Sequence, residues 1–198
     1  MRKAQLCVKR TLDIVLSLCG LLILSPLFAI AAIFIKLDSP GPVFFLQERL
    51  GKNGRPFRII KFRTMVENAE KLGEGLRVST PGDPRITRVG RILRQTSLDE
   101  LPQLINVLKG DMSLVGPRPP ATYHPYKGYA AYPEWAKKRF EMRPGITGLA
   151  QVVARNSVSW DERIRLDVDY VEGFSLWKDV KILLDTVRIV VLRESIYP

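Results

Sequence analysis

The segment TLDIVLSLCGLLILSPLFAIAAIFI, residues 11–35, decides how this chain can fold. It carries no charged residue from Ile14 to Ile35. As a helix, that stretch is about 33 Å long, which is enough to cross the hydrocarbon core of a bilayer. A cleaved signal peptide is a poor alternative, because the apolar stretch is too long and basic residues, not small ones, follow it. The segment therefore predicts a helix embedded in a membrane.

Basic residues flank this segment on both sides. Arg2, Lys3, Lys9 and Arg10 mark its start, and Lys36, Arg49, Lys52 and Arg55 follow its end. Lys and Arg are enriched on the cytoplasmic side of membrane helices, so both flanks favour that side. A helix that spans the bilayer cannot place both of its ends there, whereas a re-entrant helix can.

The dipeptide Ser25-Pro26 lies near the middle of the segment. Pro26 has no backbone N–H and disfavours helical backbone at Ser25, so we expect a kink or a break there. The Ser25 hydroxyl can donate to a carbonyl that is freed in this way. Each half would then be roughly 16–18 Å long, about half a bilayer. Since proline is also common in spanning helices, the residues alone leave both arrangements open.

Composition narrows the class of partner. The chain has 198 residues, with 31 Lys and Arg against 20 Asp and Glu, and a formal net charge of +11. The length suits one domain, and the charge indicates an anionic partner: nucleic acid, an anionic membrane surface or a phosphorylated substrate. With Cys7, Cys19 and one histidine, His124, we expect neither a zinc site nor a disulfide framework. We expect both thiols to be buried and reduced.

The rest of the chain alternates short strands, loops and helices. Val43–Gln47 and Phe57–Phe62 predict a β-hairpin across Asn53-Gly54. Further along, we expect a polar loop or short helix over 66–83, helices over 85–95 and 97–108, a rigid loop over 114–120, and a turn over 143–152 that enters a strand or helix. Residues 177–194 form an amphipathic pattern, which suits either a membrane interface or a protein core.

Two adjacent carboxylates, Asp99 and Glu100, occur in the stretch TSLDELPQL. Ser97 and Glu100 have the spacing of a capping box, in which each side chain bonds the backbone of the other residue at a helix start. Asp99 is also favourable there, because a helix N-terminus attracts negative charge. Helix capping therefore explains both acids without any chemistry.

A second interpretation comes from the neighbours of these acids. Pro102 removes an N–H from the second turn, and Arg91 and Arg94 precede the helix start, so the region favours an anion site. Two acids suit an anion site if they share a divalent cation with a phosphate. An aspartate can also attack phosphorus as a nucleophile.

Other basic residues are candidates for phosphate contacts. Lys61 and Arg63 alternate along a strand, so we expect them to project from one face. Arg118 lies between prolines, Arg143 precedes Pro-Gly, and Arg155 follows AQVVA. Each one alone is typical of a solvated surface charge. The rigid backbone around Arg118 and Arg143 favours a pre-organised contact with phosphate.

A membrane-anchored nucleic-acid-binding protein or scaffold is the alternative function. The net charge permits it. However, the sequence shows no helix-turn-helix, zinc-finger or RNP-type motif, and the uncharged run over 14–35 is atypical of such proteins. We therefore expect no nucleic-acid partner.

Several segments together resemble one family. They are KRTLDIVLS, ILSPLF, GPVFFLQERLGKNG, FRIIKFRTM, RILRQTSLDELPQLINVLKGDMSLVGPRPP, RPGITGLAQV and LDVDY, and they cover nearly the whole chain in family order. The sequence resembles the small monotopic phosphoglycosyl transferases of bacteria, the bacterial sugar transferase family. The multi-span extension of larger members is not found before this segment, so we expect the minimal catalytic form.

The resemblance implies a reaction. Such enzymes move a sugar-1-phosphate from a UDP-sugar to polyprenol (undecaprenyl) phosphate, releasing UMP, as the first membrane step of cell-surface glycan synthesis, which includes exopolysaccharide and lipopolysaccharide. By motif, Asp99 is the nucleophile of a covalent phosphosugar–aspartyl intermediate, and Mg²⁺ bridges the diphosphate and the carboxylates of Asp99 and Glu100. The carried-over substrate-binding residues are Lys61, Arg63, Arg94, Arg118, Arg143, Gln151, Arg155 and Asp167. Of these, Asp167 either holds a loop or contacts the donor.

The resemblance also implies a fold and a location. We expect an α/β fold that is mostly α, with a small β-hairpin and no doubly wound sheet. Residues 1–40 would form a re-entrant helix-break-helix with its break at Ser25-Pro26, supported by interfacial amphipathic helices. Residues 41–198 would form the catalytic domain on the cytoplasmic face of the bacterial inner membrane. The sequence leaves open which UDP-sugar is used and the oligomeric state, a homodimer included.

Overall fold

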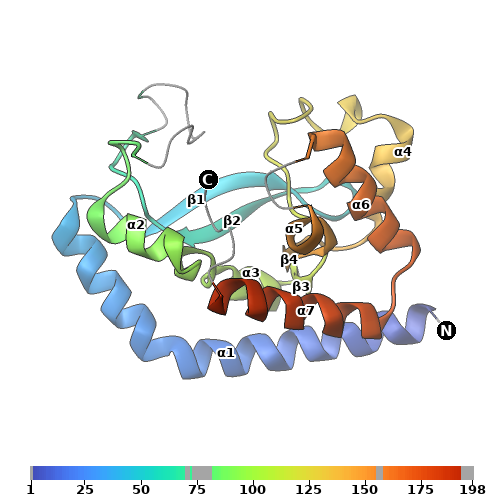
Figure 1. Ribbon diagram of the computed structural model, residues 1–198, viewed down its shortest axis with the longest axis horizontal. Helices are drawn as coiled ribbons and strands as arrows, with labels where there is room; N and C mark the ends of the chain where they lie inside the picture. Colours follow the sequence, from blue (N-terminus) through green and yellow to red (C-terminus); the bar gives the residue numbers. More distant parts are fainter. Residues whose placement is uncertain (1, 70–71, 73–81, 155–157, 193–198) are drawn as a thin grey trace.

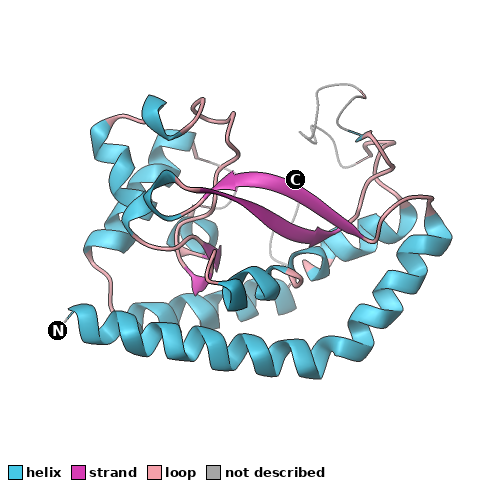
Figure 2. Cartoon of the chain, turned by 180° about the vertical axis from the view of Figure 1, so that it is seen from behind, coloured by secondary structure: helices cyan, strands magenta, loops and turns pink. Residues whose placement is uncertain are grey.

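The computed structural model describes residues 2–69, 72, 82–154 and 158–192. The long helix α1 (Arg2–Asp38) extends along one side of the molecule, and the β1–β2 hairpin crosses above it with shorter helices between and around them (Figures 1 and 2). The described strands form two sheets of two strands each. This confirms the predicted class, a mostly helical protein with a small sheet.

The remaining elements follow in chain order. They are β1 (Phe44–Leu50), η1 (Lys52–Gly54), β2 (Pro56–Phe62), α2 (Arg88–Gln95), η3 (Leu98–Glu100), α3 (Gln103–Lys109), β3 (Ser113–Val115), η4 (Tyr129–Ala131), α4 (Glu134–Lys137), η5 (Lys138–Glu141), β4 (Gly145–Thr147), α5 (Leu149–Val153), α6 (Trp160–Glu172) and α7 (Leu176–Val191). The helices predicted over 85–95 and 177–194 are confirmed as α2 and α7, and the turn over 143–152 enters both β4 and α5. The segment predicted over 66–83 lies largely outside the described residues.

Helix α1 continues through Ser25 and Pro26, so the break implied by the resemblance is wrong, and of the kink or break expected from the residues only a kink remains. Pro26 cannot donate to the carbonyl oxygen of Leu22, four residues earlier. The Ser25 hydroxyl donates to that oxygen instead, at 2.8 Å. Because the freed acceptor is satisfied within the helix, the helix does not end there, and it changes direction near its middle (Figures 1 and 2).

The two faces of α1 are inverted relative to a water-soluble helix. Lys9, Asp13 and Ser17 are only 7%, 4% and 0% exposed, whereas Leu12, Leu16 and other large apolar side chains point outward. Among the described helices, α1 is the one that is long and apolar enough to cross a membrane. Water would not favour such an apolar outer face, so the pattern suits a lipid environment.

The two cysteines lie on this outward side. Cys7 and Cys19 are both free and exposed, so the prediction of buried thiols is wrong. Their exposure follows from the inverted pattern, because apolar residues of α1 face outward and the polar stripe faces the protein.

Both ends of α1 contact the same body of the protein. In the first half, Arg10 donates to the carbonyl oxygen of Val107 in α3 at 2.7 Å. In the second half, Ile35 packs in one buried cluster with Phe62. At the end of the helix, the Asp38 carboxylate accepts from the first turn of α2 at 2.8 Å. Both halves of α1 therefore pack against the same body of the protein.

The predicted hairpin is confirmed. Strands β1 and β2 pair antiparallel, with Phe44 opposite Phe62 and Leu50 opposite Pro56. The turn between them contains Asn53 and Gly54, both with positive φ (55° and 71°). Asn and Gly adopt this backbone conformation at little cost, which is why the pair marks a turn.

A second small sheet brings two loops together. Strands β3 and β4 are parallel, and Gly116 follows β3 so closely packed that a Cβ there would lie 2.4 Å from the Arg143 carbonyl oxygen. Gly116 N–H donates to the Thr147 carbonyl oxygen at 2.9 Å. The loop predicted over 114–120 begins only after Val115, because Leu114 and Val115 lie in β3, and it is held against the segment that begins at Arg143.

Candidate active site

Asp99 and Glu100 lie in the single 3₁₀ turn η3, between α2 and α3. Ser97 precedes this turn in the left-handed conformation (φ 56°), and its side chain makes no capping hydrogen bond, so the capping-box interpretation is wrong. The helix predicted over 97–108 begins only at Gln103, with Pro102 at its N-cap. Pro102 has no N–H to donate, and at that position no helical hydrogen bond is lost.

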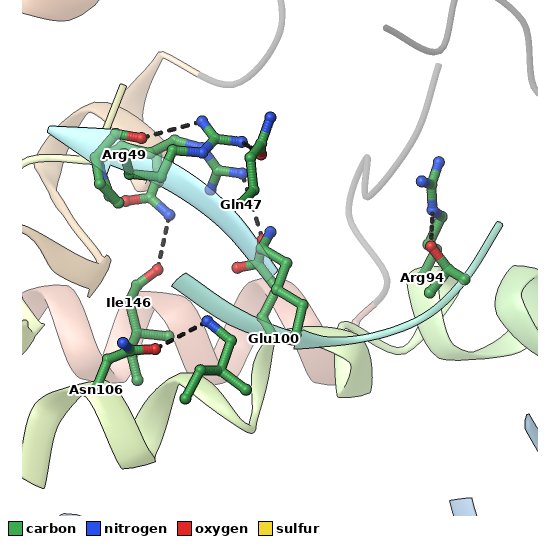
Figure 3. Close-up of polar contacts among 12 residues, drawn as sticks. Gln47, Arg49, Arg94, Glu100, Asn106 and Ile146 are labelled. Carbon is green, nitrogen blue, oxygen red and sulfur yellow. Dashed lines mark hydrogen bonds and ion pairs between the residues drawn. The ribbon is translucent and has the colours of Figure 1, made fainter. Parts of the chain in front are cut away.

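Glu100, drawn in Figure 3 near Gln47 and Arg49 of β1, is bound by two cations. Its Oε1 accepts from Lys61 Nζ at 2.5 Å and from Arg118 Nη2 at 3.3 Å, and its side chain is 22% exposed. Burial alone would raise the pKa of this carboxyl, but Lys61 and Arg118 outweigh burial and lower the pKa to about 2. Glu100 is thus ionised, and its Oε1 is already bonded to Lys61 and Arg118.

Asp99 differs in both respects. No described residue forms a hydrogen bond or an ion pair with its carboxylate. Burial, together with the charge of Glu100, raises the pKa of Asp99 to about 6, against the opposing attraction of nearby cations. Two adjacent carboxyls with pKa values moved in opposite directions indicate two different chemical roles.

Four cationic side chains surround these two carboxylates: Lys61, Arg94, Arg118 and Arg49. Arg94 donates through Nε to the Thr64 hydroxyl at 2.8 Å and attracts Asp99 electrostatically. The site therefore carries more positive than negative charge. Such an excess of cations favours a multiply charged anion as the ligand.

Arg49 was missed as a site residue from the sequence. Its guanidinium donates to the Pro119 carbonyl oxygen at 3.2 Å and to Gln47 Oε1 at 2.5 Å, and burial and the charge of Arg118 lower its pKa to about 10. The alternation of side chains along the predicted hairpin could have identified Arg49 as a site residue. Gln47, Arg49 and Lys61 share one face of the β1–β2 hairpin, because Lys61 lies opposite Phe45 in the register.

Asp167 and Arg139 hold the backbone at Arg118. Arg139 Nη2 donates to Asp167 Oδ2 at 2.5 Å and to the Arg118 carbonyl oxygen at 2.7 Å. Both side chains of the ion pair are 2% exposed. Burial raises the pKa of Asp167 to about 6 despite the attraction of Arg139. Of the two predicted roles for Asp167, its contacts match loop support.

Arg63 does not join the site. It is buried, and its Nη2 donates to the Ser39 carbonyl oxygen at 2.7 Å and to the Ile35 carbonyl oxygen at 3.3 Å, at the end of α1. Lys61 reaches Glu100 instead, so the two side chains do not share a partner as strand alternation suggested. Arg63 lies one residue beyond β2, where its guanidinium is bound by the carbonyl oxygens at the end of α1 and not by the site.

Arg143 and Gln151 also bond to backbone. Arg143 Nε donates to the Gly110 carbonyl oxygen, and Gln151 Nε2 to the Ile146 carbonyl oxygen, both at 2.9 Å. Neither residue has a hydrogen bond or ion pair with Asp99 or Glu100 among the described contacts. Arg155 lies outside the described residues.

The comparisons with known proteins place this geometry in a family. A family model described as bacterial sugar transferase matches residues 4–193. The chain belongs to the bacterial sugar transferase family. Its match to the family model therefore spans α1, the hairpin and the carboxylate site.

Three similar proteins carry specific names. The UDP-glucose:undecaprenyl-phosphate glucose-1-phosphate transferase of Caulobacter vibrioides is 47% identical over 194 residues, covering 96% of this chain and 72% of that protein. Galactosyl transferase CpsE of Streptococcus agalactiae is 45% identical, covering 96% of this chain and 43% of that protein. The UDP-N-acetylgalactosamine-undecaprenyl-phosphate N-acetylgalactosaminephosphotransferase of Aeromonas hydrophila is 45% identical, covering 91% and 43%. The chain thus spans less than half the length of the latter two sugar transferases.

Proposed function

We propose that this sugar transferase moves a sugar-1-phosphate from a UDP-sugar to polyprenol phosphate, releasing UMP. The observation that carries the proposal is the Asp99 carboxylate, which has no partner among the described residues and lies near Lys61, Arg94 and Arg118, beside Glu100 whose Oε1 is bound by two cations. The printed names of the relatives from Caulobacter vibrioides and Aeromonas hydrophila support a UDP-sugar donor and an undecaprenyl phosphate acceptor. Since the relatives differ in sugar, the donor sugar of this protein is decided by experiment.

The cations prepare the donor for attack. A diphosphate repels an approaching carboxylate, so its charge must be screened before Asp99 reaches phosphorus. Arg118 and Arg94 approach Asp99 from a proline-rich loop and from α2, so they can bind the diphosphate from two directions. Lys61 holds Glu100 and leaves Asp99 as the carboxylate that is available to react.

The transfer follows in two displacements. A carboxylate oxygen of Asp99 attacks the phosphorus bonded to the sugar, the bond from that phosphorus to the bridging oxygen breaks, and UMP leaves with the electron pair. An acyl phosphate now joins Asp99 to the sugar-1-phosphate. A phosphate oxygen of polyprenol phosphate then attacks the same phosphorus. The bond to Asp99 breaks, and its carboxylate is restored.

The carboxylates also fit Mg²⁺. This ion is commonly held by one or two carboxylates together with substrate phosphates and water. The described residues contain no cluster of three or more His, Cys, Asp or Glu that could hold a metal ion by themselves. Asp99 and Glu100 would thus hold the ion together with diphosphate oxygens. When bound, the ion would stabilise the charge that develops on the departing UMP.

We further propose a monotopic arrangement at the cytoplasmic face of the inner membrane. Both ends of α1 bind the same body of the protein, which supports re-entry of the helix over a full crossing. Helix α7 presents a second apolar stripe of exposed side chains. It consists of Trp177, Val180, Leu184, Val187 and Val191. Together the two helices would hold the site at the depth of the lipid phosphate.

The first experiment is UMP release from a panel of UDP-sugars by the full chain, with Mg²⁺ and without lipid acceptor. For the correct donor we expect a burst close to one UMP per enzyme, with the mass of a phosphosugar retained on the protein until polyprenol phosphate is added. Asp99→Asn should lower turnover by at least about 10³-fold and abolish the mass shift. Asp185→Asn, at an exposed position of α7, is the matched control.

Two outcomes would contradict the proposal. Absence of UMP release with every donor, even after polyprenol phosphate is added, would remove the transferase assignment for these donors. Full turnover of Asp99→Asn would remove the covalent step. A scaffold or nucleic-acid-binding protein would tolerate Asp99→Asn in its own function, and its DNA binding would weaken steeply with salt.

A further inference from the structure

The polar stripe on the buried face of α1 reaches the strand that precedes Arg118. Lys9, Asp13 and Ser17 recur every four residues, which places them on one side of the helix. Lys9 Nζ donates to the Val115 carbonyl oxygen at 2.9 Å, and Asp13 Oδ1 accepts from the Leu114 N–H at 3.0 Å. Helix α1 therefore makes two hydrogen bonds to the β3 backbone, one as donor through Lys9 and one as acceptor through Asp13.

Strand β3 leads directly into the active site. Val115 is followed by Gly116, Pro117 and Arg118, and the prolines on either side of Arg118 restrict the backbone. Arg118 Nη2 lies 3.3 Å from Glu100 Oε1, near the upper limit for a hydrogen bond. Together with Arg139, which holds the Arg118 carbonyl oxygen at 2.7 Å, the position of β3 therefore sets how closely Arg118 approaches Glu100.

The stripe is itself fixed by a buried network. Lys9 Nζ pairs with Asp179 Oδ2 of α7 at 2.6 Å, and the Tyr170 hydroxyl donates to Asp179 Oδ1 at 2.6 Å. Figure 1 shows α7, α3 and β3 lying along α1. Because every charge of this network has a partner, Lys9 is held in one position and can support Val115.

We propose that α1 controls the reactivity of the site, with Lys9 and Asp13 as positioning residues that hold Arg118 near Glu100 and the donor diphosphate. The placement of Arg118 near the donor diphosphate rests on the proposed function, whereas the attachment of β3 to α1 does not. Neither residue touches reacting atoms; both act through β3. The helix that anchors the protein to the membrane is then also the element that orders its phosphate-binding loop.

The attachment is tested by amide hydrogen exchange of the full chain in lipid nanodiscs. Asp13→Ala removes the acceptor for the Leu114 N–H, whereas Asp13→Asn keeps an oxygen there. We expect exchange from Leu114 to Arg118 to accelerate by about tenfold or more in Asp13→Ala and to stay near the wild-type rate in Asp13→Asn. Thr11→Ala is the matched control, because the exposed Thr11 hydroxyl bonds within α1. Unchanged exchange in Asp13→Ala would overturn the proposal, whatever the turnover.

The catalytic consequence is tested by a double-mutant cycle with Arg118→Met. Asp13→Ala and Lys9→Met should each raise KM for the UDP-sugar by about tenfold in the wild-type background, but by less than about twofold in the Arg118→Met background. A merely structural role would give equal losses in both backgrounds and would overturn the proposal. If wild-type protein releases no UMP from any donor, the proposed function fails, while the exchange result still decides whether α1 holds β3.

Discussion

The Asp99–Glu100 site and the Lys9–Asp179 contact both place carboxylates beside cations, but they differ in whether every carboxylate has a partner within the described protein. In the contact between α1 and α7, each charge is buried and bonded. Lys9 Nζ and Asp179 Oδ2 lie 2.6 Å apart, and the Tyr170 hydroxyl donates to Asp179 Oδ1. In the site, Glu100 is bonded while Asp99 has no described partner. Charges that hold the fold are satisfied by the protein, whereas the reactive charge is left for a ligand to satisfy.

The largest stability effect should come from breaking the satisfied pair. Lys9→Met leaves Asp179 as a buried charge without its cation, so we expect the free energy of unfolding to fall by about 3–5 kcal/mol. Chemical denaturation of the full chain in detergent measures this loss. Adding Asp179→Asn should recover more than half of it, because the amide that replaces the carboxylate is neutral and still accepts from Tyr170. If the double variant is no more stable than Lys9→Met, the uncompensated charge is not the cause.

The unsatisfied carboxylate should behave in the opposite way. The pKa of Asp99 is raised from 3.8 to about 6, so between these values the folded protein binds more protons than the unfolded chain, and stability falls as pH rises. Asp99→Asn should therefore stabilise the protein by about 1–2 kcal/mol near pH 8, with the gain falling as pH is lowered and vanishing below the unfolded pKa of 3.8. Thermal melting across this range checks it. A gain that is constant with pH would show that ionisation of Asp99 is not its source.

Glu100→Gln is the matched control one residue away. The pKa of Glu100 is lowered, so its charge stabilises the folded state above pH 4.5 and that contribution is lost as pH falls toward 2. Glu100→Gln should thus lower the melting temperature near neutral pH, opposite in sign to Asp99→Asn. The same sign for both variants would contradict the assigned difference between the two carboxyls.

The smallest effect on folding should come from the outward stripe of α7. Leu184 is 64% exposed, so Leu184→Ala should change the free energy of unfolding by less than about 0.5 kcal/mol. If the stripe enters lipid, the same variant should weaken partition of the protein into vesicles by about 1 kcal/mol or more. Vesicle flotation measures it, with exposed Asp185→Asn as control. Unchanged partition would remove α7 from the membrane contact.

Local patterns in the sequence predicted much of the fold. The Asn53-Gly54 turn predicted the hairpin, because few other residues adopt positive φ at low cost. The same kind of local argument predicted the Ser25 hydrogen bond but left a break at Pro26 open, and it failed at Ser97. In the first case, a single hydroxyl replaced the lost N–H and the helix continued. In the second, Glu100 found stronger partners in Lys61 and Arg118 than a helix cap provides.

The sequence by itself determined the apolar segment, the adjacency of Asp99 and Glu100 and the excess of positive charge, because each is a property of residues close along the chain or of composition. Only the tertiary structure decided which carboxylate stays unpaired among the described residues, that Arg49 belongs to the site while Arg63 supports α1, and that Lys9 and Asp13 reach β3. Pairing and pKa depend on distances in space. The partners here lie far apart in sequence, 39 positions for Lys61 and Glu100 and 170 for Lys9 and Asp179.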